Sequence, residues 1–482
     1  MSYDFTVRTP GNTPAVGSAN SARSGSPTPL GVERTVLYGT DIRRCSVPQE
    51  TLFHGDYQVA FKNRQGQGFG LNRELLSKHL LLLGGIGCGK TNVFNFIIES
   101  LQKRMSDNDV MIIFDTKGDF KGKFYDQRNP AHWLIGNDAQ YRNISRSWNI
   151  FDEMKTSAGT FHQESELIAK EIGKQLFIGR ESPSQPFFSQ AAADLVTKVL
   201  IHLMRMAART HTENQLNTDI FVRFLQTATR KTYYDMITNP YNKDFASAES
   251  YLGKPEDKMT PQALGILGYI NAMLNDLFIG VFAERSSVGS CSMRQIVREK
   301  GRRVLFVEYD LSVGETLGPM YRLIFDLALK EALGGRNANR GNVYLIIDEF
   351  KLLPNLQHID DALNFGRSLG VKVIAGLQSI NQLYESYGEN RGKVLASGFM
   401  NCFCFQTFDL DSRKFIMERF GEKYENLAMT SRSNPVSVQR SGYVVEDWNI
   451  LELGVGQAYI NLVGYQPFLF QFAKYEEPHA VL

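Results

Sequence analysis

One short segment constrains the fold of this 482-residue chain more than any other: residues 79–92 read HLLLLGGIGCGKTN. The four leucines predict a buried strand, and the apolar residues that recur at helical spacing after Asn92 predict a helix. Between them lies the pattern Gly-x-x-x-x-Gly-Lys-Thr, whose glycines let backbone N–H groups curve around phosphates. A strand, this loop and a helix together predict a site for a nucleoside triphosphate.

The loop and the start of the helix supply the predicted nucleotide-binding residues. We expect Lys90 to reach the β- and γ-phosphates and the Thr91 hydroxyl to ligate magnesium, so the predicted cofactors are ATP and Mg²⁺. The predicted nucleotide-binding set is Gly84, Gly85, Ile86, Gly87, Cys88, Gly89, Lys90, Thr91 and Asn92.

A second motif, LIIDEF, places an acid pair directly after a buried apolar run. We expect Asp348 to hold magnesium through water and Glu349 to polarise the attacking water. The glutamate indicates repeated hydrolysis by a motor rather than phosphoryl transfer to a small substrate. Asp115 also follows an apolar run, and the carboxyl ends of parallel strands are where such sheets bind ligands.

Two further residues give weaker patterns. Gln378 ends the run VIAGLQS, where a strand-end amide between the phosphates and the nucleophile can sense the γ-phosphate, although glutamines are common at strand ends. Arg367 lies in a helical pattern, where arginines are usually solvated. In a ring of subunits it could reach a neighbour's phosphates as an arginine finger.

The order of elements predicts an α/β fold with a mostly parallel central sheet and an inserted all-α domain. Residues 1–34 are rich in Ser, Gly and Pro and predict a flexible tail. We expect the nucleotide-binding domain at residues 35–156 and 291–482, with the all-α domain at 157–290. Within that insertion, AAADLVTKVLIHLMRMAART predicts one amphipathic helix. Five further buried strands are predicted at residues 110–114, 304–309, 343–347, 371–375 and 402–405.

Composition restricts the function classes only loosely. Hydrophobic residues make up 43% and charged residues 22%, as in a soluble globular protein, and the net charge of +2 gives no direct argument for nucleic acid. A channel can still carry a local basic lining. The five cysteines form no CxxC pair, which predicts reduced thiols. No apolar run of about 20 residues occurs, so we expect no transmembrane segment and a cytoplasmic location.

The motifs occur in a distinctive order: GGIGCGKTN, DTKGDF, SRSWNIF, LIIDEFKLLPNL, LNFGRSLGVKVIAGLQS and QLYESYG. Over residues 36–470 this order resembles the coupling ATPases of type IV secretion and conjugation, which are TraG/TraD-like proteins of the HerA/FtsK superfamily. The resemblance implies a RecA-like domain interrupted by an all-α domain and assembled as a homo-hexamer. It also implies that Arg367 acts in trans and that Gln378 is the sensor.

The implied cargo is single- or double-stranded DNA in the central channel, and the implied partner is a relaxase or a secretion-channel component. Many relatives carry N-terminal transmembrane helices where this chain has a polar tail. We therefore expect a peripheral position at the inner face of the membrane, held by a partner. Two alternatives stay open: a HerA-like motor working with a nuclease in repair or defence, and a loader of protein substrates. Basic residues of the insertion are candidate DNA contacts or solvated helix surface: Arg205, Arg209, Arg223, Arg230 and Lys231.

Overall fold

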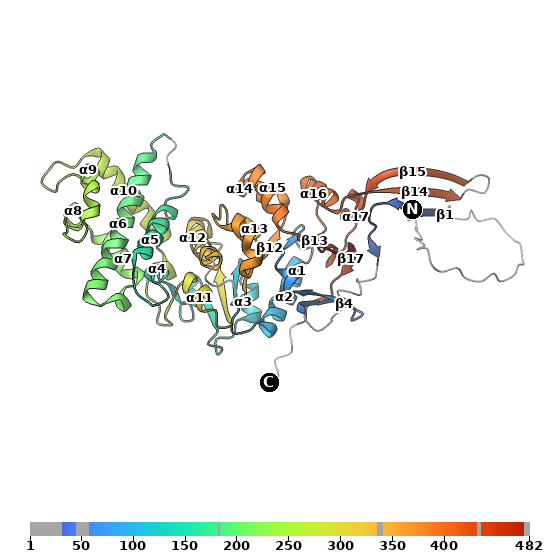
Figure 1. Ribbon diagram of the computed structural model, residues 1–482, viewed down its shortest axis with the longest axis horizontal. Coiled ribbons are helices and arrows are strands. Elements are labelled where there is room, and N and C mark those ends of the chain that lie inside the picture. The colour runs from blue at the N-terminus through green and yellow to red at the C-terminus, as the bar shows by residue number, and fades with distance from the viewer. Residues whose placement is uncertain (1–30, 45–56, 182–183, 335–340, 431–434, 477–482) are drawn as a thin grey trace, which may run out of the picture.

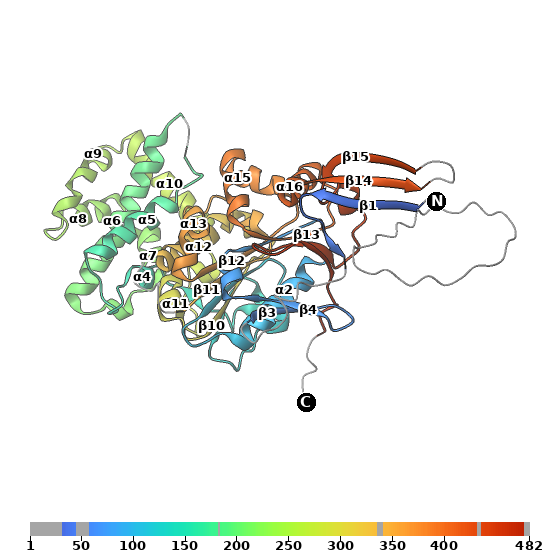
Figure 2. The same cartoon turned by 45° about the vertical axis from the view of Figure 1, so that its right-hand side comes forward.

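The computed structural model describes residues 31–44, 57–181, 184–334, 341–430 and 435–476. These residues form an elongated molecule with three parts (Figure 1). A bundle of helices lies at one end, a large sheet covered by helices lies in the centre, and a three-stranded antiparallel sheet extends from the other end (Figure 2).

The central sheet has ten strands among the described residues, in the order β2-β17-β16-β13-β5-β12-β11-β6-β10-β7. All neighbours from β13 to β7 are parallel. Strand β16 pairs antiparallel with both β13 and β17, and β17 pairs parallel with β2. The predicted mostly parallel α/β sheet is therefore confirmed. The strands are Arg43–Arg44 (β2), Leu80–Leu83 (β5), Val110–Asp115 (β6), His132–Ile135 (β7), Arg303–Glu308 (β10), Val343–Ile347 (β11), Val371–Leu377 (β12), Asn401–Phe405 (β13), Gln457–Asn461 (β16) and Phe468–Gln471 (β17). Each predicted strand agrees with these bounds to within two residues at either end.

The sheet is buried on both faces because its strands are apolar at consecutive positions. Leu81 and Leu83 belong to one hydrophobic core, whereas Leu80 and Leu82 belong to the core on the other face. On the second face lie α2, α3 and the hairpin of β3 and β4; on the first lie α12, α13 and α14. The elements that cover the sheet are Tyr57–Lys62 (β3), Gly68–Asn72 (β4), Arg73–Leu76 (α1), Lys90–Arg104 (α2), Asp119–Phe124 (α3), Met293–Glu299 (α11), Gly314–Leu333 (α12), Ile359–Leu369 (α13), Ile380–Tyr387 (α14), Glu389–Gly398 (α15), Leu410–Phe420 (α16) and Asp447–Leu451 (α17).

The helical part lies between two short parallel strands, β8 (Ser147–Trp148) and β9 (Ser290–Cys291). Its α-helices are Ile150–Met154 (α4), Gln163–Gln175 (α5), Pro186–Thr210 (α6), Thr218–Thr227 (α7), Arg230–Ile237 (α8), Glu249–Leu252 (α9) and Pro261–Leu277 (α10). The predicted amphipathic helix is α6. By length and composition alone α6 could cross a membrane, but 67% of its apolar window is buried inside the fold, as in a core helix.

The antiparallel sheet at the far end is formed by β1 (Gly31–Tyr38), β14 (Glu422–Thr430) and β15 (Pro435–Tyr443). The prediction of a tail over residues 1–34 is wrong for residues 31–34, because they pair with β14. Residues 1–30 lie outside the described residues. Gly31 pairs with Thr430, so the strand depends on a backbone partner almost 400 positions away.

Candidate nucleotide-binding site

The phosphate loop, residues 84–89, is held in shape by three neighbouring segments. Gly84 N donates to Leu377 O at the end of β12 (3.1 Å), and Gly85 N donates to Gln406 O after β13 (2.8 Å). Gly456 N, in the turn before β16, donates to Cys88 O (2.8 Å). Gly87 and Gly89 have φ angles of 74° and 108°, which side chains other than glycine rarely adopt. Backbone hydrogen bonds and glycine conformations within the protein therefore set the curvature of the loop.

Lys90 begins helix α2 and turns its amine back into the loop. The amine donates to Gly84 O (2.5 Å) and Gly85 O (2.9 Å), and it lies 3.9 Å from Cys88 Sγ. Thr91 follows in the same helical turn. Ile86, in contrast, is 85% exposed and lies on the outside of the loop. The loop residues and the first turn of α2 thus lie side by side after β5, and their binding of a nucleotide stays a prediction.

The strand order places the predicted chemical groups along one edge of the sheet. The phosphate loop follows β5, the acid pair Asp348–Glu349 follows β11, and β12 lies between these two strands. Gln378 follows β12, so it lies between the phosphate loop and the acid pair. Its Nε2 donates to Glu349 Oε2 (2.5 Å). The amide therefore orients the carboxylate that we expect to polarise water.

Three carboxylates gather at this edge. Burial, reinforced by the negative charges of Glu349 and Asp115, raises the pKa of Asp348 to about 7. Burial also raises the pKa of Glu349, although the hydrogen bond from Gln378 opposes this effect. The pKa of Asp115 is raised by burial as well, and Lys121 N donates to its Oδ2 (2.7 Å). Such a cluster favours a bound cation, because a positive charge relieves the repulsion.

The residues present fit a magnesium nucleotide. Within the described part of the chain, Asp115 Oδ1 and Glu349 Oε1 are buried and have no hydrogen-bond partner. Buried carboxylate oxygens normally have partners. Bound water, an ion or a phosphate-bearing ligand would supply them here.

Lys117 is a residue of this edge that the site prediction omitted. It follows Asp115 in the motif DTKGDF, and its positive charge lowers the pKa values of both Asp348 and Glu349. The residue is exposed, so its amine can meet a ligand from outside. The sequence signal that could have identified Lys117 is its position between the end of a predicted strand and a glycine, Gly118. The φ of Gly118 is 71°.

The side chain of Asn92, which the sequence places in the nucleotide-binding set, has hydrogen-bond partners within the protein. Its Nδ2 donates to Ala473 O (2.9 Å), and its Oδ1 accepts from Tyr475 N (2.7 Å). Asn92 thus fastens the C-terminal segment to α2, and its binding of the nucleotide stays a prediction.

Arg367 is far from the phosphate loop of its own chain. It lies in the last turn of α13, just before β12 begins at Val371, and β12 runs seven residues to Leu377. At about 3.3 Å per residue this strand is about 23 Å long, and Gln378 lies beyond its far end. The side chain is 60% exposed and lies 3.7 Å from Glu74. Arg367 is therefore presented on the opposite edge of the sheet.

These features define the class of protein. A phosphate loop and an acid pair follow two parallel strands, and the strand that ends before Gln378 lies between them. This arrangement is a RecA-like P-loop nucleoside-triphosphatase fold, here with an inserted all-α domain. The model of one family, described as the type IV secretion-system coupling protein DNA-binding domain, matches residues 67–442. The chain belongs to this family.

Named relatives agree with the assignment. The chain is 20% identical over 366 residues to a probable conjugal transfer protein TraG of Sinorhizobium fredii, covering 74% of this chain and 54% of that protein. It is 21% identical over 347 residues to the coupling protein TraD of Escherichia coli, covering 72% and 44%. The chain thus spans about half the length of these curated relatives. The solved plasmid coupling protein TrwB, in complex with the ATP analogue ADPNP, has the same fold, with a TM-score of 0.70, 18% identity and coverage of 92% and 96%.

Proposed function

We propose that the chain is an ATP-hydrolysing subunit of a ring-shaped motor that moves DNA for type IV secretion or conjugation. One observation carries the proposal. The phosphate loop, the acid pair and Gln378 meet at one edge of the sheet, while Arg367 is exposed at the opposite edge. A site that is complete except for an arginine, in a chain that presents an arginine elsewhere, is suited to head-to-tail assembly.

Each residue of the site would have its own role in ATP hydrolysis. Lys90 would hold the β- and γ-phosphates, and Thr91 and Asp348 would hold Mg²⁺. When bound, the ion would neutralise charge on the phosphates. Glu349 would accept a proton from the attacking water, with Gln378 fixing its orientation through the 2.5 Å hydrogen bond. Arg367 of a neighbouring copy would complete the site.

Assembly follows from the positions of these groups. A contact between opposite edges of the same domain is heterologous, and it closes into a ring when the rotation per subunit divides a full turn. We propose six copies, as the family resemblance implies. The description of the family as a DNA-binding domain supports DNA as the cargo. The names of the relatives support a role in transfer, with a relaxase or a channel component as partner.

The contacts of the cationic side chains in the helical part restrict the surfaces at which DNA could bind. Arg205 forms ion pairs with Glu166 and Asp244, and the Arg209 guanidinium lies 3.5 Å from the centre of the Tyr241 ring. Two others have protein acceptors as well: Arg223 pairs with Asp219, and Arg230 donates to Leu252 O and Asp257 O. We therefore propose that DNA meets the channel of the assembled ring first and that the all-α domain receives a protein. The ring would lie in the cytoplasm, at the membrane only through a partner.

The first experiment measures ATP turnover with and without DNA. We expect turnover that DNA stimulates, and loss of turnover in Lys90→Ala. The matched control is Lys103→Ala, on the same helix α2, where the amine is 65% exposed and pairs with Glu99. Turnover without any response to DNA would favour the protein-loading alternative. Equal turnover in Lys90→Ala and wild type would refute the motor.

The second experiment tests Arg367. We expect Arg367→Ala to lower turnover by about a thousandfold or more, the scale of an arginine finger, while nucleotide affinity changes little. The variant should also poison wild-type subunits when the two are mixed, since it leaves a neighbour's site incomplete. The control is Lys393→Ala, an exposed cation on α15 that pairs with Glu389. Wild-type turnover by isolated monomers would contradict a trans-acting role.

A further inference from the structure

One carboxylate of the all-α domain contacts the helix that carries Arg367. Glu171 lies on α5, and its Oε1 is 3.2 Å from His358 Nε2. His358 is the N-cap residue of α13, and Arg367 is in the last turn of that helix. The other oxygen of Glu171 forms an ion pair with Lys330 on α12. A single side chain thus connects the all-α domain, α12 and the start of the Arg367 helix.

Helix α12 connects the same elements through a second set of contacts. Asp326 is fully buried, and its carboxylate accepts from Gln357 N (2.8 Å) and His358 N (3.1 Å), just before α13 begins. Four residues earlier, Arg322 donates to Gln175 O and Ile178 O at the end of α5 (3.3 Å each). The end of α5 and the beginning of α13 are therefore both attached to α12, which lies between them (Figure 1).

Helix α13 connects these contacts to Arg367. The helix has eleven residues, which is about 16 Å at 1.5 Å per residue. One face is buried from Ile359 and Ala362 in the first turn to Gly366 beside Arg367, whose side chain is 60% exposed. A tilt of the helix would therefore shift the guanidinium.

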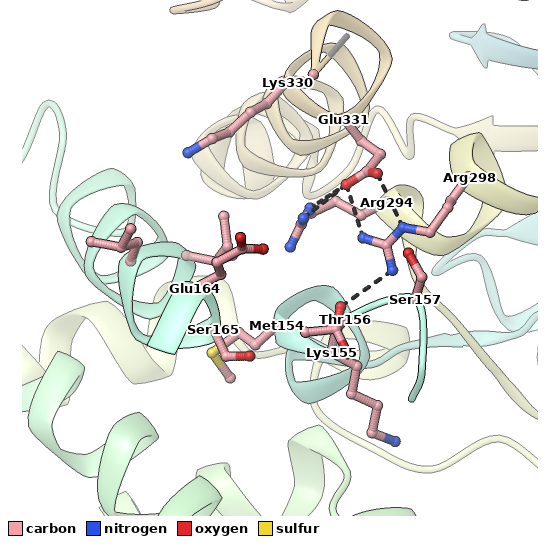
Figure 3. A pocket seen from close by; sticks show the side chains of 13 residues that line it. Met154, Lys155, Thr156, Ser157, Glu164, Ser165, Arg294, Arg298, Lys330 and Glu331 are labelled. Atoms are coloured by element: carbon pink, nitrogen blue, oxygen red, sulfur yellow. Dashed lines mark hydrogen bonds and ion pairs between the residues drawn. The ribbon is translucent and has the colours of Figure 1, made fainter. Parts of the chain in front are cut away.

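The junction around Glu171 combines apolar and charged contacts. Ile172 of α5 and Leu323 of α12 lie in the same hydrophobic core. A cavity of about 440 Å³ lies nearby, between the segment from α4 to α5 on one side and helices α11 and α12 on the other (Figure 3). Arg294 and Arg298 of α11 both bind Glu331 of α12 there, and Lys330 lies on the same helix. Charged side chains therefore line part of the boundary between the all-α domain and α12.

We propose that Glu171 is a positioning residue that transmits the binding of DNA in the channel of the ring to Arg367, through α5, His358 and α12. DNA in the channel would change the position of α5. The Glu171–His358 contact would then tilt α13 and set whether Arg367 reaches the neighbouring site. The inference rests on the proposed function, because it requires Arg367 to act on a neighbour. It adds regulation to that site. The contacts from α5 through Glu171 and His358 to α13 are the physical connection between the all-α domain and Arg367.

The test compares Glu171→Gln with Glu166→Gln. Both residues lie on α5, but the described ion pair of Glu166 is with Arg205, inside the all-α domain. We expect Glu171→Gln to reduce the stimulation of kcat by DNA about fivefold or more, the usual scale of coupling between sites, with the KM for ATP nearly unchanged. Glu166→Gln should keep the wild-type stimulation.

A second measurement follows α13 directly. Adding DNA and an ATP analogue to wild-type rings should change amide hydrogen exchange over residues 357–369, and this change should be absent in Glu171→Gln. If wild type shows no change there, or if Glu171→Gln matches Glu166→Gln in both assays, the inference is wrong. The wild-type measurement decides the question even if the variant fails to fold. Failure of the proposed function is a separate outcome, in which Lys90→Ala and Arg367→Ala retain turnover.

Discussion

Glu153 lies at the point where the chain enters and leaves the all-α domain, and its replacement by glutamine makes a quantitative prediction. The side chain is fully buried, and its carboxylate accepts four hydrogen bonds. Oε1 accepts from Trp148 Nε1 (2.8 Å) and Met293 N (2.6 Å), and Oε2 accepts from Ser292 Oγ (2.9 Å) and Arg294 N (3.0 Å). Burial raises the pKa of Glu153, and the four donors oppose that rise.

Glutamine keeps the shape but supplies one acceptor oxygen and one donor group. If the NH₂ takes the place of Oε1, it faces two N–H donors. If it takes the place of Oε2, Ser292 Oγ can rotate to accept, but Arg294 N loses its partner. A buried donor without a partner costs about 1–3 kcal/mol, and the remaining bonds weaken because the acceptor is no longer charged. The substitution no longer buries a charge, but the donors around residue 153 lose a charged acceptor, and these two effects offset each other. The net cost of Glu153→Gln in local stability of the junction should therefore be about 2–4 kcal/mol.

The assay is hydrogen exchange of a peptide that contains Met293 and Arg294, which reports local opening without requiring two-state unfolding of the whole chain. A cost of about 3 kcal/mol corresponds to exchange about a hundredfold faster at these amides. Glu256→Gln makes the same chemical change at an exposed position and should leave the peptide unchanged. Unchanged protection in Glu153→Gln would refute the reasoning, because it would mean that the four bonds do not hold the junction.

Two further predictions concern single side chains of the nucleotide-binding domain. Asn92→Ala should destabilise the protein by about 1–3 kcal/mol, because Ala473 O and Tyr475 N lose the hydrogen bonds to its side chain. The affinity for a fluorescent nucleotide should change little. A large loss of affinity with unchanged stability would contradict the role of Asn92 in fastening the C-terminal segment. Burial lowers the pKa of His79 from 6.5 to about 4, so the unfolded chain takes up its proton first as the pH falls, and stability is lost from pH 6.5 down to pH 4. Between pH 7 and pH 5 this loss should be about 2 kcal/mol, measured by urea unfolding, and absent in His79→Asn, since asparagine tolerates the φ of 58°. Equal pH dependence in both proteins would show that His79 is not the cause.

Much of the nucleotide site could be predicted because its determinants are local. The glycines, Lys90 and Thr91 lie within eight consecutive residues, and Asp348, Glu349 and Gln378 each follow directly after a strand whose apolar run is visible in the sequence. Parallel strands bring their carboxyl ends to one edge, so correct strand predictions were enough to place these residues together. The all-α insertion was visible for the same reason, as a long region of helical periodicity without strands.

The remaining features depend on pairings between distant segments. The backbone of strand β1 pairs with β14, and the residues near Gly31 do not show which distant segment will be their partner. Asn92 reads as part of the phosphate-loop motif, but Ala473 and Tyr475 occupy both of its polar atoms. Local periodicity cannot reveal such partners, because they arise only when the folded chain brings together residues that are hundreds of positions apart.

The sequence by itself thus indicated which chemical groups are present and which family they belong to: a phosphate loop, an acid pair, a strand-end amide and the coupling proteins. Only the tertiary structure decided how these groups are arranged for work. It places Arg367 at the edge opposite its own phosphate loop, at the far end of β12, and connects its helix to the all-α domain through Glu171 and His358. The physical reason is that a motif of neighbouring residues shows which chemical groups are present, whereas the packing of the whole sheet determines the direction in which each side chain points.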